Sequence, residues 1–310
     1  MHYWRTEKNR FFSFLFIFSH LALISFSWAK ENPRQITDAT GVQVTLKDRP
    51  QRIVTLAPSL GELASDLVEG EMERIVGVSE FSDYPPRLKK VASIGPYHQF
   101  NLEKVLSLKP DLVLATTDGN PKDRVLQLRE LGVPVVVINT ESFQQMTASI
   151  QLAALSIGNS KLGEKMALQL TRGLEAIRNR TREKVRGKAP LKVLLQLSDD
   201  PLIVVGQKSF LHSALEAVGA QNVYSNSEAH YPKLSLEDVI HRNPDVIIVI
   251  SLGENPTHSQ QMAKKWNQFP ILKAVQNHRV EVLQSDTLLK PTIRILEGLS
   301  LLERIFYGRK

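Results

Sequence analysis

The sequence contains no cysteine. This absence excludes disulfide bonds, thiolate metal sites and a lipid-modified N-terminal cysteine. The catalytic signatures GxSxG, P-loop and HExxH are also missing, as is a dinucleotide-binding GxGxxG after a strand. Eight histidines are scattered without the i, i+4 spacing of a helical metal site. These absences favour a binding protein over an enzyme and give no reason to expect a bound cofactor.

The chain also lacks concentrated basic charge, although its formal net charge is +7. No cluster of basic residues with interleaved aromatic residues is present, so a nucleic acid partner is not expected. The 310 residues are 42% hydrophobic and 23% charged, which is typical of a globular chain. A chain of this length can form two domains, each with its own core.

The N-terminus has the pattern of a secretory signal. A basic head that includes Arg5 and Arg10 precedes an apolar run at residues 11–26 and the small-x-small end Ser27-Trp28-Ala29. We therefore predict a signal peptide at residues 1–29, cleaved after Ala29. The alternative is an uncleaved membrane anchor, because the apolar run approaches the roughly 20 residues that span a bilayer. If the signal is cleaved, we expect a soluble protein of a Gram-negative periplasm.

The most informative feature is a repeated segment. Residues 101–115 read NLEKVLSLKPDLVLA and align without a gap on residues 235–249, which read SLEDVIHRNPDVIIV. Each copy begins with an N-cap residue, Asn101 or Ser235, continues as a helix to a Pro-Asp break, and ends in an apolar run. Such runs are typical of strands buried on both faces. The repeat predicts an α/β protein of two Rossmann-like lobes with mostly parallel sheets.

Strand and helix patterns alternate through both halves of the chain. Residues 35–52 predict an N-terminal β-hairpin, and a later helix is expected with Ser59 as N-cap and Glu62 in the capping-box position. Residues 161–184 lack proline and predict one long amphipathic helix between the lobes. We therefore expect a signal peptide at 1–29, an N-terminal lobe at 30–158, a connecting helix at 159–188 and a C-terminal lobe at 189–310. Because the connecting helix is stiff, only a small closing motion of the lobes is expected.

A ligand of two α/β lobes lies in the cleft beyond the carboxyl ends of their strands. The repeat register pairs Tyr97 with Tyr231, and each tyrosine has a histidine beside it, His98 or His230. One interpretation is that the tyrosines grip a flat or bulky ligand and the histidines ligate a metal; the other is that all four are ordinary loop residues. The loops after the strands add further candidate ligand-binding residues: Phe81, Tyr84, Thr117, Asp118 and Asp286.

Each helix of the repeat carries a glutamate at its second position, Glu103 or Glu237. The helix dipole favours a carboxylate there, which is a sufficient reason for one of them. Two equivalent acids on the two lobes also form a matched pair of anchors for arginines of a symmetric partner.

Several segments together resemble a known family. They are RIVTLAPSLGEL at residues 52–63, VGVSEFSDYPP at residues 76–86, the first repeat copy and the long connecting helix. They resemble the helical-backbone class of periplasmic substrate-binding proteins, which serve ABC importers of iron-siderophores, haem and cobalamin. The chain is most similar to the cobalamin (vitamin B12) branch, from about Ile36 to the C-terminus.

The resemblance implies roles for particular residues. Glu103 and Glu237 would dock arginines of a membrane-embedded permease dimer. Cleft aromatics and an acid of the second lobe would hold the ligand, and the matching positions here are Phe81, Tyr231 and Asp286, with Lys290 where the family has an arginine. We expect a monomer that binds a small-molecule metal chelate.

The identity of the ligand stays open between two classes. A corrinoid is expected, and the alternative is haem or a ferric siderophore, in which Tyr97, His98, His230 or Tyr231 would contact the iron or its chelate. A more distant alternative is a secreted hydrolase, although no nucleophile or metal cluster accompanies its candidate acids, which are Asp83, Asp118, Asp199 and Asp286.

Overall fold

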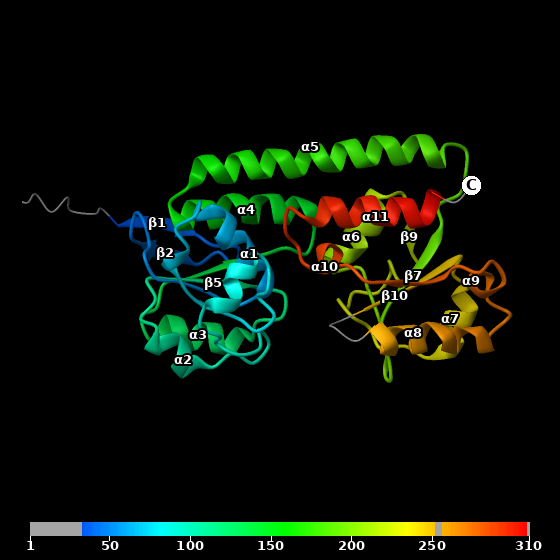
Figure 1. The fold of residues 1–310 in the computed structure, drawn as a ribbon, viewed down its shortest axis with the longest axis horizontal. Helices are drawn as coiled ribbons and strands as arrows, with labels where there is room; N and C mark the ends of the chain where they lie inside the picture. Colours follow the sequence, from blue (N-terminus) through cyan, green and yellow to red (C-terminus); the bar gives the residue numbers. More distant parts are fainter. Residues whose placement is uncertain (1–32, 252–255, 309–310) are drawn as a thin grey trace, which may run out of the picture. The chain divides into compact units, whose positions relative to one another are not determined.

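The computed structural model describes residues 33–251 and 256–308. The signal peptide expected over residues 1–29, with its cleavage after Ala29, lies outside the described residues. The described residues form one compact unit that contains two mainly parallel sheets, one in each lobe (Figure 1).

The N-terminal lobe combines an antiparallel hairpin with a four-stranded parallel sheet of order β4-β3-β5-β6. Its strands are β1 (Arg34–Thr37), β2 (Gln43–Leu46), β3 (Ile53–Thr55), β4 (Ile75–Val78), β5 (Leu112–Thr116) and β6 (Val135–Ile138). Its helices are α1 (Pro58–Leu67), η1 (Met72–Arg74), η2 (Pro86–Lys90), α2 (Leu102–Ser107), α3 (Lys122–Glu130) and α4 (Phe143–Ile157). The predicted hairpin and the predicted parallel sheet with crossover helices are both confirmed.

The C-terminal lobe has a five-stranded sheet of order β11-β10-β7-β8, in which β9 also pairs with β7. All its strand pairs are parallel except β7 with β8. The strands are β7 (Lys192–Asp199), β8 (Leu202–Val204), β9 (Gln221–Asn222), β10 (Val246–Ile250) and β11 (Val280–Leu283). The helices are α6 (Phe210–Ala217), α7 (Leu236–Arg242), α8 (Pro256–Lys265), η3 (Trp266–Gln268), α9 (Lys273–Gln276), α10 (Asp286–Leu289) and α11 (Ile295–Tyr307).

Helix α5 (Ser160–Val185) follows the N-terminal lobe and packs on both α4 and α11 (Figure 1). It is the long amphipathic helix that the sequence predicts. An added Cβ at Gly163 would lie 2.2 Å from the Cβ of Ala154, so the missing side chain lets α5 approach α4 closely. The buried side chains of α5 recur at helical spacing and include Met166, Leu170, Leu174 and Ile177.

Each parallel sheet is buried on both faces, as the apolar runs of the repeat predict. In β5, Leu112 joins a core cluster with residues from both lobes and α5, whereas Val113 joins a separate cluster within the N-terminal lobe. In β10, Val246 joins the same shared cluster, and Ile247 joins a separate cluster within the C-terminal lobe. Successive side chains of a strand point to opposite faces, so both faces need apolar residues.

Both repeat copies begin with the predicted N-caps. The Asn101 side chain accepts a hydrogen bond from the Lys104 amide at 2.9 Å, and the Ser235 side chain accepts one from the Asp238 amide at 3.3 Å. These contacts satisfy amides that the first helical turn leaves without a partner.

The aspartates of the two Pro-Asp breaks fasten neighbouring strands. The Asp111 carboxylate accepts hydrogen bonds from the amides of Gln51 (3.0 Å) and Arg52 (2.7 Å), just ahead of β3. The Asp245 carboxylate accepts one from the amide of Lys192 (2.9 Å), the first residue of β7. Since β3 pairs with β5 and β7 with β10, each aspartate fixes the start of the strand beside its own.

The predicted capping box at Ser59 and Glu62 is wrong. Helix α1 begins at Pro58 and has Ala57 as N-cap, without a side-chain cap. Proline suits the first helical position because its missing N–H would lack a partner there in any case. Glu62 is 1% exposed and bonds to the C-terminal lobe instead of its own helix.

Three helices are present that the sequence patterns did not identify: α4, α9 and α10. As a result, Asp286 lies in the first turn of α10 and not in a loop. Helices of four residues such as α9 and α10 are too short to be stable alone and depend on tertiary packing.

Candidate functional site

A cavity of about 250 Å³ lies where the two lobes meet. The N-terminal lobe contributes residues that follow the carboxyl ends of its strands, and the C-terminal lobe contributes α6, the loop before α7 and the turn after α10. The lining residues are Ala57, Pro58, Ser59, Phe81, Tyr97, Thr116, Asp118, Thr140, Phe210, Tyr231, Leu289, Lys290 and Pro291. This is the position expected for the ligand of a two-lobed α/β protein.

Phe81 presents an aromatic ring at this cavity. It lies in the loop after β4, and 76% of it is exposed. Its backbone φ is 62°, in the left-handed region that residues other than glycine rarely adopt. Such conformations concentrate at functional sites, where the surrounding structure holds them. The exposed ring therefore offers apolar surface to a ligand.

Asn120 fixes the loops that carry the N-terminal part of the lining. Its side-chain amide donates to the carbonyl oxygens of Leu56 (2.9 Å) and Tyr97 (2.8 Å), and its side-chain oxygen accepts from the Thr116 amide (2.9 Å). The side chain is buried, so these bonds are protected from water. Three loops from different parts of the chain are thus held in one arrangement.

Tyr97 packs against a glycine of the same loop cluster. A Cβ at Gly119 would lie 2.2 Å from the Tyr97 ring, and the φ of Gly119 is 91°. Both the contact and the backbone conformation require glycine here. The absence of a side chain at Gly119 lets the Tyr97 ring approach the backbone next to Asp118.

Tyr231 of the C-terminal lobe and Asp118 of the N-terminal lobe interact across the cavity. Burial raises the pKa of Asp118, and the nearby His230 opposes that shift. Burial also raises the pKa of Tyr231, and the negative charge of Asp118 raises it further. His230 itself contacts Glu141 of the other lobe, with 3.2 Å between Nε2 and Oε1. A neutral tyrosine beside a carboxyl group is suited to hydrogen bonding.

The turn after α10 is tied to the N-terminal lobe. Lys290 Nζ lies 2.7 Å from Asp83 Oδ1, and Glu62 accepts hydrogen bonds from Thr292 (2.6 Å) and Arg294 (3.1 Å). Burial raises the pKa of Asp83, but the hydrogen bond and the charge of Lys290 outweigh burial and leave this pKa below its usual range. For Glu62, burial dominates and raises the pKa.

Five of the nine residues predicted to bind the ligand line this cavity: Phe81, Tyr97, Asp118, Tyr231 and Lys290. They come from both lobes. The repeat register predicts Tyr97 and Tyr231, and the loops after strands predict Phe81 and Asp118. The structure therefore brings together residues that are up to about two hundred positions apart in the chain.

The other four predicted residues lie outside the lining. The Tyr84 ring lies 3.6 Å beneath the Arg294 guanidinium, and His98 packs edge-on against Tyr97 with 5.4 Å between ring centroids. Thr117 lines a neighbouring pocket of about 450 Å³, and Asp286 is exposed at the start of α10.

Besides the five predicted residues, the lining includes four residues at the carboxyl ends of β3 and β5, in loops that the strand rule indicates: Ala57, Pro58, Ser59 and Thr116. Sequence reasoning missed the other four: Thr140, Phe210, Leu289 and Pro291. Thr140 follows β6, so the rule that identified the other wall loops applies to it as well. Phe210 is the first residue of α6, and nothing in the local pattern distinguishes it from a core residue. Leu289 and Pro291 flank Lys290 and reach the cavity only because the turn is held against the other lobe.

The histidines considered as metal ligands, His98 and His230, do not belong to a larger group of ligands. Across the described residues, 33–251 and 256–308, no cluster of three or more histidine, aspartate or glutamate side chains could hold a metal ion. Three of the four acids considered for a hydrolase are also apart from the cavity lining. Asp199 pairs with Lys265, Asp83 with Lys290, and Asp286 is exposed.

Glu103 and Glu237 are both exposed in the first turns of α2 and α7. Within the described part of the chain, neither forms an ion pair. Hydrogen bonds from its own backbone amide and from the Ser235 side chain lower the pKa of Glu237. Both carboxylates therefore face solvent and are available to a partner.

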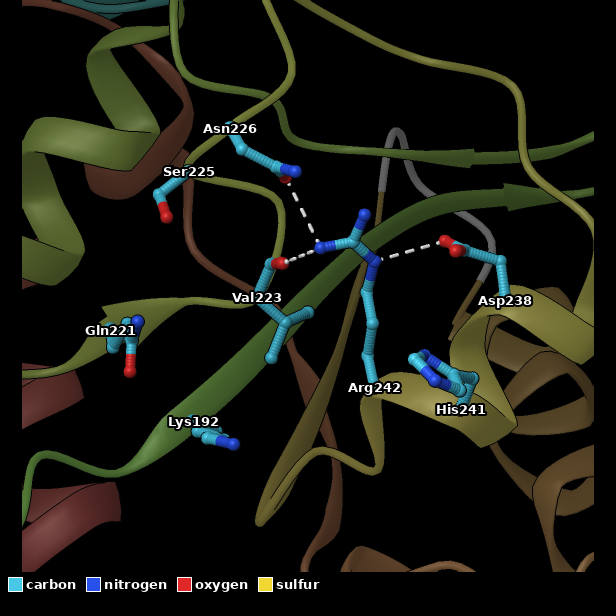
Figure 2. Close-up of a pocket in the computed structure, with 8 residues that line it drawn as sticks. All are labelled: Lys192, Gln221, Val223, Ser225, Asn226, Asp238, His241 and Arg242. Carbon is cyan, nitrogen blue, oxygen red and sulfur yellow. Dashed lines mark hydrogen bonds and ion pairs between the residues drawn. The ribbon is translucent and has the colours of Figure 1, made fainter.

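A larger pocket of about 520 Å³ lies in the C-terminal lobe, beside α7 and β9 (Figure 2). Its central side chain is Arg242, which bonds to Asp238 (3.0 Å), the Val223 carbonyl oxygen (2.7 Å) and Asn226 (3.1 Å). The guanidinium also lies 4.3 Å from the centre of the Tyr224 ring. These contacts join α7 to the loop after β9, so we assign Arg242 a structural role and not a ligand-binding one.

Among the described residues, no helix is both long enough and apolar enough to cross a membrane.

Two parallel-sheet lobes, a long helix that packs against both, and a cavity at their junction define a bilobal ligand-binding protein. The chain belongs to the periplasmic binding protein family, whose family model matches residues 53–287. The relatives described next are likewise named as binding proteins and not as enzymes.

Several relatives cover most of the chain. A vitamin B12-binding protein of Vibrio cholerae is 31% identical over 248 residues, which are 80% of this chain and 86% of the relative. The crystal structure of a periplasmic vitamin B12-binding protein of the same species is 29% identical, with a TM-score of 0.74 over 84% of this chain and 99% of that one. A periplasmic haem-binding protein of Roseiflexus is 27% identical, with a TM-score of 0.72 over 83% and 98% of the two chains.

Proposed function

We propose that this protein is the periplasmic receptor of an ABC importer, and that it captures cobalamin or a related corrinoid between its lobes. The observation that carries the proposal is the lining of the cleft. Aromatic rings from both lobes line the cavity, and Lys290, the only lysine or arginine among the described residues of the lining, is paired with Asp83. These described residues therefore offer apolar contact and no unpaired lysine or arginine, which suits a bulky ligand without net charge.

The size of the cavity indicates how such a ligand would lie. Pockets that enclose drug-sized ligands usually have volumes of roughly 300–1,000 Å³, and this cavity has about 250 Å³. One end of a corrinoid would enter the cavity, and the rest would lie along its mouth against exposed surfaces such as Phe81.

Haem is the second candidate, and the Roseiflexus relative supports it. A tyrosine ligates haem iron as a phenolate. Burial and the neighbouring Asp118 raise the pKa of Tyr231, which disfavours the phenolate. His230 is engaged with Glu141, and His98 does not line the cavity. These features favour the corrinoid over haem.

Equilibrium titration of the purified protein with cyanocobalamin and with haemin, followed by visible absorption, tests the proposal. We expect saturable binding of one cyanocobalamin per protein and weaker binding of haemin. Tighter binding of haemin, or no binding of cyanocobalamin, would overturn the corrinoid assignment. A panel of ferric siderophores extends the same test to the remaining ligand class.

We further propose that the protein acts as a monomer and delivers its ligand by seating Glu103 and Glu237 on a permease dimer. Export is proposed to depend on residues 1–29, with cleavage after Ala29. N-terminal sequencing of the exported protein checks the cleavage, because an uncleaved product would begin at Met1.

A further inference from the structure

The charge environment of the cleft is set by residues that do not all touch the cavity. Lys290 belongs to the lining, but Asp83, which neutralises it, approaches from the loop after β4 in the other lobe. The Lys290 side chain is 16% exposed and that of Asp83 is 43% exposed, so the cation is the more enclosed partner. An ion pair in such a partly enclosed site is screened less by solvent than a pair at the open surface.

Neighbouring residues hold the segments that carry Lys290 and Asp83 in place. Tyr84 follows Asp83 and stacks beneath Arg294, with 3.6 Å between the guanidinium carbon and the ring centroid. Arg294 and Thr292 both bond to the buried carboxylate of Glu62. The turn that carries Lys290 is therefore fixed against the same lobe that carries Asp83, which keeps the Lys290 ammonium within reach of that carboxylate.

A ligand with carboxylates would meet an unfavourable site. To pair with Lys290, an anionic group would have to approach within reach of the Asp83 carboxylate, which repels it, or displace that carboxylate. Discrimination of this kind, in which a site presents a repulsive element to the wrong partner, is a common source of specificity. A ligand without net charge does not meet this repulsion.

We propose that Asp83 determines the charge selectivity of this receptor: by occupying Lys290 it disfavours anionic chelates and leaves the cleft to ligands without net charge. This inference rests on the proposed function, because it concerns the ligand site of that function. It assigns a specificity role to a residue outside the cavity lining.

The test compares D83N with a matched variant of the same loop, E80Q. Both remove one negative charge, but Glu80 is exposed and forms no ion pair with any described residue, whereas Asp83 contacts Lys290. The probes are haemin, which carries two propionates, and cyanocobalamin, which has no net charge. Thermal unfolding of each variant reports whether it is folded, and D83S provides a second substitution if D83N is not.

We expect D83N to bind haemin about tenfold more tightly than both the wild type and E80Q, and to change cyanocobalamin affinity by less than about threefold. The gain should disappear in D83N/K290Q, because it depends on the freed ammonium. Equal haemin affinities in D83N and E80Q, or a gain that persists without Lys290, would overturn the proposal. If the wild type binds no cyanocobalamin, the corrinoid function fails, and the haemin comparison still decides the role of Asp83.

Discussion

Asp111 and Asp245 make equivalent contacts in the two lobes, and each contact involves the backbone of the strand beside its own. Hydrogen bonds from backbone amides to a carboxylate are charge-assisted and stronger than neutral ones. The two aspartates therefore fix the position of the neighbouring strand in each sheet. Their repetition in the sequence reflects this shared structural role.

Replacement of Asp111 by asparagine should lower the free energy of unfolding by about 1–2 kcal/mol, because one of two charge-assisted acceptors is lost. Asp245→Asn should have a smaller effect, since Asp245 accepts one such bond from Lys192. Chemical denaturation measures both values. Asp123→Asn, at an exposed position of α3, is the control and should change stability by less than about 0.5 kcal/mol.

The effect of Asp111→Asn should depend on pH. Burial raises the pKa of Asp111, but hydrogen bonds from the amides of Gln51 and Arg52 outweigh burial and leave this pKa below its usual value. Folding thus favours the ionised form of Asp111. The contribution of this carboxylate to the free energy of unfolding is complete above the unfolded-state pKa of roughly 4, and it is lost as the pH falls through the lower folded-state pKa. Denaturation curves at pH 7 and pH 3 should show a smaller difference between wild type and variant at pH 3. An equal difference at both values would contradict this account.

Phe81 combines high exposure of its ring with a position in the lining of the cavity. Phe81→Ala should weaken cyanocobalamin binding roughly three- to tenfold, the range expected for loss of an aromatic contact. Stability should change little, because 76% of Phe81 is exposed. Leu131→Ala is a matched control, since Leu131 is 57% exposed and does not line the cavity. Unchanged affinity in Phe81→Ala would exclude the ring from the ligand contact.

At the scale of elements, the helices α2 and α7 occupy equivalent positions in the two lobes. Each begins at a side-chain cap, is followed by a Pro-Asp break, and leads into a fully buried strand. An acid in the first turn is also favoured by the helix dipole. The docking role of Glu103 and Glu237 is therefore separable from the role of the helices in folding.

Reversal of both charges in E103K/E237K should abolish ligand-stimulated ATPase activity of the reconstituted transporter and leave cyanocobalamin affinity within about twofold. The variant E164K/E175K makes the same change of charge at two exposed positions of α5 and should retain stimulation. Titration and ATPase assays on the same preparations separate the two properties. Full stimulation by E103K/E237K would leave the helix dipole as the only reason for these glutamates.

For the whole molecule, the structure bears on how far the lobes can separate. Helix α5 packs on α4 of the first lobe and α11 of the second, and one core cluster continues through both lobes and α5. The bonds of Glu62, Lys290 and His230 also cross between the lobes. Apolar packing of this kind resists a wide hinge motion.

Small-angle X-ray scattering should therefore give nearly the same radius of gyration with and without cyanocobalamin. A binding-competent cleft that is largely preformed involves backbone shifts of about 1 Å or less. A large contraction upon ligand addition would show that the lobes close by a hinge. A dilution series separates lobe closure from association between molecules, because only association depends on protein concentration.

The sequence by itself determined most of the alternation of strands and helices, the duplicated lobe and the long helix, because periodicity, N-caps and apolar runs are local properties of the chain. The repeat register placed Tyr97 and Tyr231 at equivalent positions, four residues ahead of the two copies. Only the tertiary structure decided which distant side chains meet. The partners of Glu62, the pairing of Asp83 with Lys290 and the contribution of Phe210 all depend on how two lobes pack, and no local pattern encodes that packing. Glu62 shows the difference most clearly, because its spacing predicted a helix cap and its burial between the lobes gave it another partner.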